Sequence, residues 1–557
     1  MVLIIGLDGA TWDLLGPWIA AGRLPHLARL QREGWWGPLE STIPAATLPS
    51  WSTFMTGVNQ GKHGIFDFTR RELGSYAVRF VNATFRKTPT AWKLLSDAGR
   101  RVCVLGVPGT YPPETVNGCM VSGFDTPVTT RADASFVSPR ALAPLVMRSG
   151  GFPFADFQEF RVTRGWHRLA LDRLLRGIEV NTRLACTFLR REHWDCFLLL
   201  FGESDTVAHH FWKFHDRGSP RFEARGATEF ADAIQRVYEA LDYAVGTLRA
   251  AAPDAAVLVA SDHGFGGASK KAIYLNQWLV EQGLQRANRA QTRSRLATAA
   301  KRMALQVVPP RVQARAFRLS GGRWAGRLES RSRFAGIDWS GTRAFSEELN
   351  YFPSVWLNLK GREPQGTVDV ADYERVREEV CSATLALRDP EHGRPVVRRA
   401  WRREEIYHGP WVQYAPDIVL DLALDGRYSY NCLPSGRAPT NRATGVLDDT
   451  ACAGGKLAGM NGSHRREGVF LLSTNAGKTG GGGFLPGVRI ADMAPTILDL
   501  CGVEAPADFD GKTINGVAQT TQDLAMPAAQ RQRGEEFYGE AEEGEIAARL
   551  GALGYLE

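Results

Sequence analysis

The stretch Leu258-Val259-Ala260-Ser261-Asp262-His263-Gly264-Phe265-Gly266 joins an apolar run directly to a carboxylate and an imidazole. Such a run is typical of a strand that is buried on both faces of a parallel sheet. Asp262 and His263 stand where this strand would end, and open α/β sheets bind ligands at the carboxyl ends of their strands. Gly264 and Gly266 would let the chain bend there. The stretch therefore predicts an α/β fold with a functional site at one edge of its sheet.

Similar short apolar runs recur along the chain, and each ends at or near a Gly, Asp or Ser. They span residues 2–7, 102–107, 196–201, 257–260, 418–422 and 469–472. Segments with helical periodicity alternate with them, at 24–33, 92–98, 169–190 and 229–250. Strands that alternate with helices indicate βαβ units. We therefore expect an α/β fold around a mostly parallel central sheet.

The composition is ordinary for a globular protein, with 557 residues of which 44% are apolar and 23% are charged. A chain of this length can bury a large core or form more than one domain. It contains no apolar run of about 18 residues, so no transmembrane helix is expected. The first residues have no basic region and indicate a strand that ends before Asp8 rather than a signal peptide. The eight cysteines are scattered, which favours a reduced, cytoplasmic protein.

The positive charge is concentrated in one segment. Residues 286–333 contain thirteen Lys or Arg and one acid, a net charge of +12 that leaves −5 for the rest of a chain whose total is +7. The simplest interpretation is a solvated helical cap. The segment could instead steer an anionic substrate, or make peripheral contact with an anionic membrane and present a lipid-linked phosphate. No recognised motif supports binding to a specific nucleic acid.

These features divide the chain into four parts. Residues 1–281 and 345–519 are expected to form one α/β core in two pieces. Residues 282–344, with a helical pattern that ends at Pro309-Pro310, are the basic helical insertion or cap. Residues 520–557 are a polar tail in which 540–550 could form a helix.

Six carboxylates and imidazoles are candidate metal ligands: Asp8, Asp205, His209, Asp262, His263 and His464. Divalent zinc accepts imidazole nitrogen and carboxylate oxygen, and a catalytic site leaves one position open for substrate. Asp205 and His209 share one face if the chain turns helically after the strand at 196–201, because they are four residues apart. His464 lies in a glycine-rich loop that precedes the strand at 468–472.

Each of these residues has a simpler explanation when it is taken alone. An Asp after a strand is more often a helix N-cap or a turn former, and a single Asp-His pair is more often a surface feature. His210 directly follows His209, so the spacing does not settle which imidazole faces the site. What favours a metal centre is that most of the candidates fall near strand ends of one α/β domain.

Thr47 is the candidate nucleophile. It lies in a segment rich in hydroxyl side chains, residues 41–57, and precedes Pro49 and a helical run. A hydroxyl at a helix N-terminus is placed where the helix dipole and free N–H groups favour an alkoxide or a phosphate. A metal ion would lower the pKa of this hydroxyl and orient it for attack. The alternative, which the pattern alone favours, is that Thr47 only caps the helix.

Three further motifs complete a resemblance to the alkaline phosphatase superfamily. They are Gly6-Leu7-Asp8-Gly9-Ala10-Thr11-Trp12-Asp13, Gly61-Lys62-His63-Gly64-Ile65-Phe66-Asp67-Phe68, and Ile490-Ala491-Asp492-Met493-Ala494-Pro495-Thr496-Ile497-Leu498 followed by Asp510-Gly511. The pattern is most similar to the type I phosphodiesterase and nucleotide pyrophosphatase branch. It also resembles bacterial predicted phosphohydrolases or phosphomutases of the superfamily. The resemblance covers residues 1–280 and 345–515 and implies an alkaline-phosphatase-like three-layer α/β sandwich.

The resemblance also implies a role for each candidate residue. Thr47 matches the metal-bound nucleophile of a Thr-x-Pro motif, which becomes a phospho-threonine. The ligands of one metal would be Asp205, His209 and His464. The ligands of the other would be Asp8, Asp262 and His263, joined by the Thr47 oxygen. The expected cofactors are two divalent ions, with zinc preferred and manganese or magnesium as alternatives.

One position departs from the family pattern. The phosphodiesterase branch carries an Asn that holds a phosphate oxygen where this chain has Phe68. Three nearby cations, Lys62, Arg70 and Arg71, could replace it as substrate contacts, and a cation would suit a phosphomonoester, which carries more charge than a diester. A solvated face is the alternative for these three cations, and it is the one the sequence favours.

The resulting expectation is a two-metal phosphohydrolase that cleaves a phosphodiester or a nucleotide-type pyrophosphate. A phosphomonoesterase or a phosphomutase on the same site is the second reading, and a non-catalytic phosphate-binding protein is the third. The expected substrate is a small phosphorylated molecule such as a nucleotide, a sugar nucleotide or a lipid-linked phosphate. No oligomeric state is predicted.

Overall fold

The computed structural model describes residues 1–127, 134–155, 157, 162, 164–288, 333–334, 336–438, 442–452, 459–474, 482–514 and 535–552. Most of the basic insertion, residues 289–332, and residues 520–534 and 553–557 of the polar tail therefore lie outside the described residues. The helical cap and its steering or membrane role fall on that part of the chain.

A mostly parallel sheet forms the centre of the molecule. In the described part of the chain it has ten strands, nine of them in the order β20-β2-β19-β9-β1-β8-β5-β6-β7, with β21 paired to β2. Their bounds are β1 (Val2–Leu7), β2 (Trp35–Glu40), β5 (Val102–Leu105), β6 (Gly118–Val121), β7 (Val137–Ser138), β8 (Cys196–Phe201), β9 (Ala256–Ala260), β19 (Glu467–Ser473), β20 (Gly483–Phe484) and β21 (Val488–Arg489). The five inner strands, from β9 to β6, run parallel, while β19 and β7 run antiparallel on either side.

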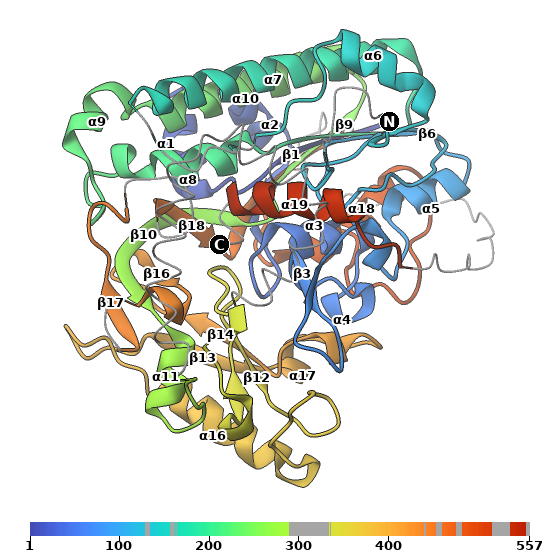
Figure 1. The fold of residues 1–557 in the computed structure, drawn as a ribbon. Helices are drawn as coiled ribbons and strands as arrows, with labels where there is room; N and C mark the ends of the chain where they lie inside the picture. Colours follow the sequence, from blue (N-terminus) through green and yellow to red (C-terminus); the bar gives the residue numbers. More distant parts are fainter. Residues whose placement is uncertain are drawn as a thin grey trace.

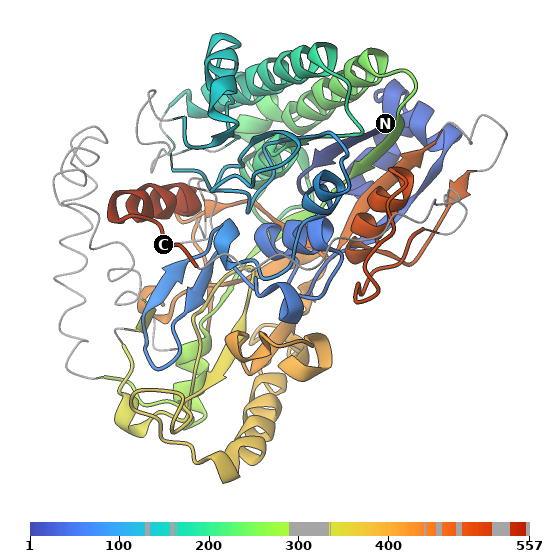
Figure 2. The same cartoon turned by 90° about the vertical axis from the view of Figure 1, so that its right-hand side faces the viewer.

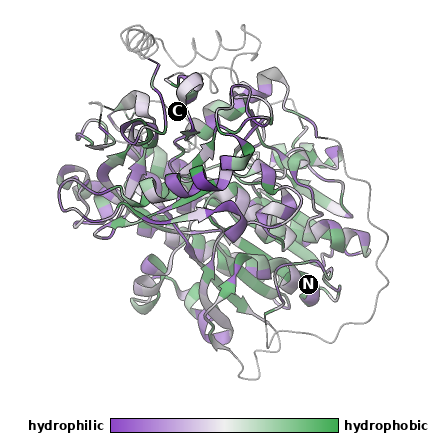
Figure 3. Cartoon of the chain, turned by 90° about the horizontal axis from the view of Figure 1, so that it is seen from below, coloured by the Kyte–Doolittle hydropathy of each residue, from purple (hydrophilic) through white to green (hydrophobic). Residues whose placement is uncertain are grey.

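Helices cover both faces of this sheet (Figure 1). One face carries α1 (Trp12–Ala20), α2 (Pro25–Glu33), α7 (Trp166–Arg191), α8 (Glu203–His215) and α10 (Ala233–Ala251), and the other carries α3 (Thr47–Thr56), α5 (Ala91–Asp97) and α18 (Met493–Leu500). Strand β1 is buried throughout, and Leu3 and Ile5 belong to one apolar cluster whereas Val2 and Ile4 belong to the other. The three-layer α/β sandwich predicted from the sequence is therefore confirmed, and the strands at its centre are coloured as hydrophobic in Figure 3.

A smaller region lies below the central sheet in Figure 1. The long strand β10 (Gly264–Ile273) extends into it and pairs with β16 (Tyr428–Cys432), β17 (Thr444–Val446) and β18 (Gly462–Arg465); β15 (Leu424–Asp425) pairs with β16. A second, antiparallel sheet contains β11 (Ala344–Phe345), β12 (Ser354–Leu357), β13 (Val397–Arg402) and β14 (Ile418–Leu422). Helices α11 (Leu275–Glu281) and α16 (Tyr373–Leu385) pack against these strands.

The apolar run at 418–422 therefore belongs to this antiparallel sheet and not to the parallel one. Its outer end is only partly buried, so its pattern was compatible with either sheet.

The described end of the chain packs on the core. Helix α19 (Glu540–Ala552) runs beside the first part of the chain (Figure 2). Tyr538, Ile546 and Leu550 join the apolar cluster that contains Leu48 and Phe68. None of the described helices is both long enough and apolar enough to span a membrane.

Candidate metal centre and active site

The site lies where β1, β8 and β9 end. Asp8 follows β1 directly, and Asp262 and His263 form the short link between β9 and β10. Asp205 stands in the first turn of α8, which follows β8, and His209 is one turn further along the same helix. The parallel register of the three strands places their carboxyl ends side by side, so residues far apart in sequence meet at one edge of the sheet.

The first group of candidate ligand atoms consists of those of Asp205, His209 and His464. Asp205 Oδ1 is 3.3 Å from His209 Nε2 and 3.5 Å from His464 Nε2, and the two imidazole nitrogens are 3.1 Å apart. All three side chains are buried. His464 reaches this group from β18, where Phe265 is its partner in β10, and not from a loop as the sequence suggested.

The second group consists of Asp8, Asp262 and His263, whose ligand atoms all lie within 4.8 Å of one another. His263 Nε2 is 3.6 Å from Asp8 Oδ1 and 3.3 Å from Asp262 Oδ2. The carboxylates are held from their other sides, because Trp51 Nε1 donates to Asp8 Oδ2 and the backbone N–H of Gly9 donates to Asp262 Oδ1.

The two groups adjoin. The rings of His263 and His464 stack with their centroids 3.7 Å apart, and Asp205, His263 and His464 also lie within 4.8 Å of one another.

Each imidazole is oriented by a backbone carbonyl. The Nδ1–H groups of His209, His263 and His464 donate to the carbonyl oxygens of Gly462, Gly264 and Ala45, at 3.1, 3.0 and 3.0 Å. A carbonyl can only accept, so Nδ1 carries a proton, and in a neutral imidazole Nε2 then presents its lone pair towards the carboxylates. Metal-ligating histidines are oriented by such contacts in known metalloproteins.

The electrostatics of the cluster suit divalent cations. Among the described residues, Asp8 Oδ1, Asp205 Oδ1 and Asp262 Oδ2 are buried and have no hydrogen-bond partner. Burial and the charge of Asp262 raise the pKa of Asp8 well above its usual value, and burial raises the pKa of Asp262 to about 8. Three buried carboxylates and three buried imidazoles are therefore assembled at a cost that bound metal ions would offset.

Thr47 is the first residue of helix α3 and not its N-cap. The N-cap is Ala46, which has no side chain able to cap the helix. The Thr47 hydroxyl lies 3.3 Å from His263 Nε2, and because that nitrogen carries no proton, the hydroxyl donates to it. The structure therefore brings Thr47 together with the second ligand group at a helix N-terminus, where anions are favoured.

The imidazole next to His209 faces away from the cluster. The ring of His210 packs at the edges of Phe157 and Trp166, with ring centroids 5.4 and 5.1 Å apart. His209, and not its neighbour His210, is therefore the imidazole that faces the cluster, a choice that the sequence left open.

The three cations near Phe68 are each paired with an acid. Lys62 contacts Asp510 at 2.7 Å, Arg70 contacts Glu535 at 2.6 Å, and Arg71 forms a fully buried pair with Glu363. Phe68 itself packs in an apolar cluster. None of these pairs involves the two ligand groups, and a role in substrate binding stays a prediction.

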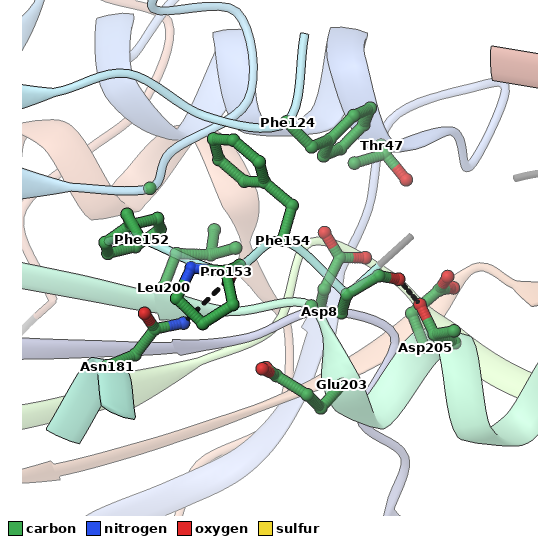
Figure 4. A pocket seen from close by; sticks show the side chains of 14 residues that line it. Asp8, Thr47, Phe124, Phe152, Pro153, Phe154, Asn181, Leu200, Glu203 and Asp205 are labelled. Carbon is green, nitrogen blue, oxygen red and sulfur yellow. Dashed lines mark hydrogen bonds between the residues drawn. The ribbon is translucent and has the colours of Figure 1, made fainter. Parts of the chain in front are cut away.

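A pocket opens beside the two ligand groups (Figure 4). Asp8, Thr47 and Asp205 line one end of it. Its remaining walls are formed by Gly106, Phe124, Phe152, Pro153, Phe154, Ala155, Asn181, Leu200, Gly202, Glu203 and Thr206.

Sequence reasoning missed three residues at this site. Tyr351 stacks on His464 with centroids 4.1 Å apart, and its hydroxyl is 3.5 Å from His209 Nδ1. Asn181 and Glu203 line the pocket. Only Glu203 carried a signal, since it stands two residues before Asp205 in the first turn of the same helix.

A double cluster of buried carboxylates and imidazoles beside a hydroxyl, at the carboxyl edge of an α/β sheet, is the arrangement of a metal-dependent hydrolase. The chain belongs to the type I phosphodiesterase / nucleotide pyrophosphatase family, whose model matches residues 2–442. Membership places it among metal-dependent enzymes that hydrolyse phosphate esters and anhydrides.

Solved structures support the fold. Phosphonoacetate hydrolase from Sinorhizobium meliloti 1021, in complex with phosphonoacetate or with phosphonoformate, aligns with TM-scores of 0.53 and 0.52 and 17% identity, over 90% of this chain and 95% of that chain. Human ectonucleotide pyrophosphatase / phosphodiesterase 5 aligns over 92% of this chain and 97% of that chain at 14% identity, with a TM-score of 0.45. No curated protein sequence matches the chain.

Proposed function

We propose that this protein is a two-metal phosphohydrolase in which Thr47 attacks a phosphodiester or pyrophosphate and carries the phosphoryl group as a phospho-threonine. The observation that carries the proposal is the Thr47 hydroxyl, 3.3 Å from His263 Nε2, at the N-terminus of α3. The six ligand side chains converge beside it. The candidate nucleophile and the candidate metal ligands therefore lie together at a helix N-terminus, where anions are favoured.

The residues divide the work between the two groups. Asp8, Asp262 and His263 would hold one divalent ion next to Thr47, and Asp205, His209 and His464 would hold the other. When bound, two such ions lower the pKa of the attacking hydroxyl and offset the charge on the attacking and leaving oxygens. His263 Nε2, which would bind the ion, lies 3.3 Å from the Thr47 hydroxyl, so the ion and the attacking oxygen would be neighbours. Trp51 and Gly9 fix the two carboxylates, so that little reorganisation is needed during the reaction.

Zinc is the metal that this donor set favours, since imidazole nitrogens and carboxylate oxygens are mixed in both groups. Manganese and magnesium are the alternatives to compare in the assay. We assign the protein to a reducing, cytoplasmic environment because its eight cysteines are free thiols, including Cys103 and Cys119, whose sulfurs are 3.1 Å apart.

Diester or pyrophosphate cleavage is favoured over monoester cleavage by the family. A nucleotide, a sugar nucleotide or a lipid-linked phosphate would suit such chemistry. A phosphomutase would use the same Thr47 and return the phosphoryl group to the substrate. A non-catalytic binding protein is disfavoured because every expected ligand side chain is present.

The test compares Thr47→Ala with Thr47→Ser on bis(p-nitrophenyl) phosphate and p-nitrophenyl phosphate, each with Zn²⁺ or Mn²⁺. The Ala variant should lose at least about a thousandfold in kcat, because the nucleophile is gone, and the Ser variant should keep measurable turnover. Metal content measured by mass spectrometry serves as the control for site integrity. Undiminished turnover by Thr47→Ala would refute the nucleophile assignment.

A further inference from the structure

The pocket beside Thr47 has apolar walls and a polar floor, which is formed by Asn181 and Glu203. Phe124, Phe152, Phe154 and Leu200 form apolar walls (Figure 4). Glu203 and Asn181 lie at the far side from Thr47, and both are only 2% exposed. An aromatic wall with buried oxygen atoms at one end indicates a ligand that is itself divided into an apolar part and a polar end.

The polar atoms at the floor are acceptors that the protein does not satisfy. Among the described residues, Glu203 Oε2 and Asn181 Oδ1 are buried and have no hydrogen-bond partner, while Asn181 Nδ2 donates to the carbonyl of Pro153 at 3.0 Å. Leaving such buried acceptors unpaired lowers the stability of the protein. A ligand that brings hydrogen-bond donors would recover this energy.

Small residues create the space for this floor. A Cβ at Gly177 would lie 2.8 Å from Glu203 Oε1, so any larger residue would displace the carboxyl from this position. Gly177 and Asn181 are four residues apart on α7 and share one face. A Cβ at Gly106, where φ is +80°, would lie 2.6 Å from the Phe152 ring. The chain thus keeps both the carboxyl and the aromatic wall in position.

The size of the pocket limits what can enter. The cavity holds about 30 Å³, whereas about 10–15 Å³ suffices for one water and about 150 Å³ holds a benzene ring. A small head group therefore enters without rearrangement, and a purine base does not. A primary ammonium matches the lining best, because it brings three donors and a positive charge to a carboxyl and to aromatic faces.

We propose that this pocket binds the ammonium end of a short aminoalkyl ester arm on the substrate phosphate, with Glu203 and Asn181 as the specificity-determining acceptors. The proposal rests on the proposed function in one respect, namely that the phosphate is held at Thr47 and the two ligand groups. Hydroxyl-ended arms share the donor chemistry but lack the charge.

The experiment measures binding and not turnover. Zinc-loaded Thr47→Ala protein is titrated calorimetrically with three probes of similar size: O-phosphoethanolamine, ethyl phosphate and glycerol 3-phosphate. O-phosphoethanolamine should bind at least tenfold more tightly than ethyl phosphate, with glycerol 3-phosphate between them. Equal Kd values for O-phosphoethanolamine and ethyl phosphate would overturn the proposal, and tighter binding of glycerol 3-phosphate would overturn the ammonium assignment.

Pocket variants test the residues in the same background. Glu203→Gln and Glu203→Leu should abolish the tenfold ratio, and Asn181→Leu should reduce it. Glu179 lies on the exposed face of α7, the helix that carries Asn181, so Glu179→Gln should keep the tenfold ratio. Two Glu203 variants are used so that a folding defect in the Leu form leaves the Gln form to decide. Persistence of the ratio in Glu203→Gln would exclude this residue. Failure of the wild-type enzyme to release phosphate would refute the proposed function without altering this binding ratio.

Discussion

Adjacent histidines on α8 provide a matched test of the metal centre. His209→Gln removes a nitrogen that lies 3.3 Å from Asp205 and 3.1 Å from His464. His210→Gln removes a similarly buried imidazole whose ring, within the described part of the chain, packs on the rings of Phe157 and Trp166. The two substitutions have the same chemistry, the same helix and nearly the same burial, and they differ in whether the ring faces the ligand cluster.

The two substitutions should change different quantities: His209→Gln should weaken metal binding, and His210→Gln should lower the free energy of unfolding. Loss of groups that only orient a ligand weakens metal binding about 10- to 100-fold, so loss of the ligand itself should cost at least about 100-fold. At a metal concentration 100 times the wild-type Kd, the stabilisation from that ion would fall from about 2.7 to about 0.4 kcal/mol. His210→Gln should lose the contacts with these two rings, which are worth about 1–3 kcal/mol of unfolding free energy, and should leave metal binding intact.

The assay combines metal content, thermal unfolding with and without added metal, and phosphate release. His209→Gln should retain one ion per chain, gain less stability from added metal and lose activity. His210→Gln should bind two ions and keep its activity at a temperature where it is folded. The reverse pattern, with His210→Gln losing metal and His209→Gln keeping it, would refute the geometry of the first ligand group.

Three further changes have defined outcomes. Gly9→Ala would force a side chain into a backbone with φ of +65° and place its Cβ 3.0 Å from Asp205 Oδ1, so thermal unfolding should show a loss of about 1–2 kcal/mol and metal titration a weaker first site. Burial raises the pKa of Glu348 to about 7, so the stability that its protonated form contributes is complete below about pH 4.5 and is lost as the pH rises through 7. Denaturant titrations should show that the free energy of unfolding falls by up to about 1.4 kcal/mol per pH unit in this window, and that Glu348→Gln removes this dependence. Identical pH dependence in the two proteins would contradict the prediction. Arg221→Met would leave the carbonyl of Met460, which it contacts at 2.6 Å, without this donor, and should lower the midpoint of thermal unfolding by an amount equivalent to about 1–3 kcal/mol.

The parts of the fold that sequence predicted well are those governed by local pattern. The run at 2–7 and the run at 196–201 match β1 and β8 residue for residue, because a strand buried on both faces has an uninterrupted apolar sequence. The helical spacing of Asp205 and His209 was also correct, since a crossover helix must follow a parallel strand. The resemblance to a family, and not the spacing of the residues, assigned the candidate ligands to two groups.

What the sequence could not supply depends on long-range pairing. His464 belongs to a strand because β18 pairs with β10, and nothing in its own glycine-rich sequence predicts that partner. The role of Gly264 also depends on a distant segment, because a Cβ there would lie 1.9 Å from the carbonyl oxygen of Glu467 at the start of β19. This glycine allows close approach of two strands and does not serve as a bend.

Pairing of charges is equally invisible to sequence. Arg71 has its partner Glu363 nearly three hundred residues further along the chain, so a cation near a motif cannot be assigned to substrate from proximity alone. Asn181 lies on a long amphipathic helix and has no signal of its own until the pocket is assembled.

The stereochemical course at phosphorus tests the covalent role of Thr47 most directly. A phosphodiester made chiral by sulfur and oxygen isotope substitution would be hydrolysed by the metal-loaded enzyme and the configuration of the product determined by phosphorus NMR. Each in-line displacement inverts the phosphorus centre, so transfer to Thr47 followed by transfer to water gives overall retention. Net inversion would mean that water attacks the substrate directly, and it would contradict a phospho-threonine intermediate.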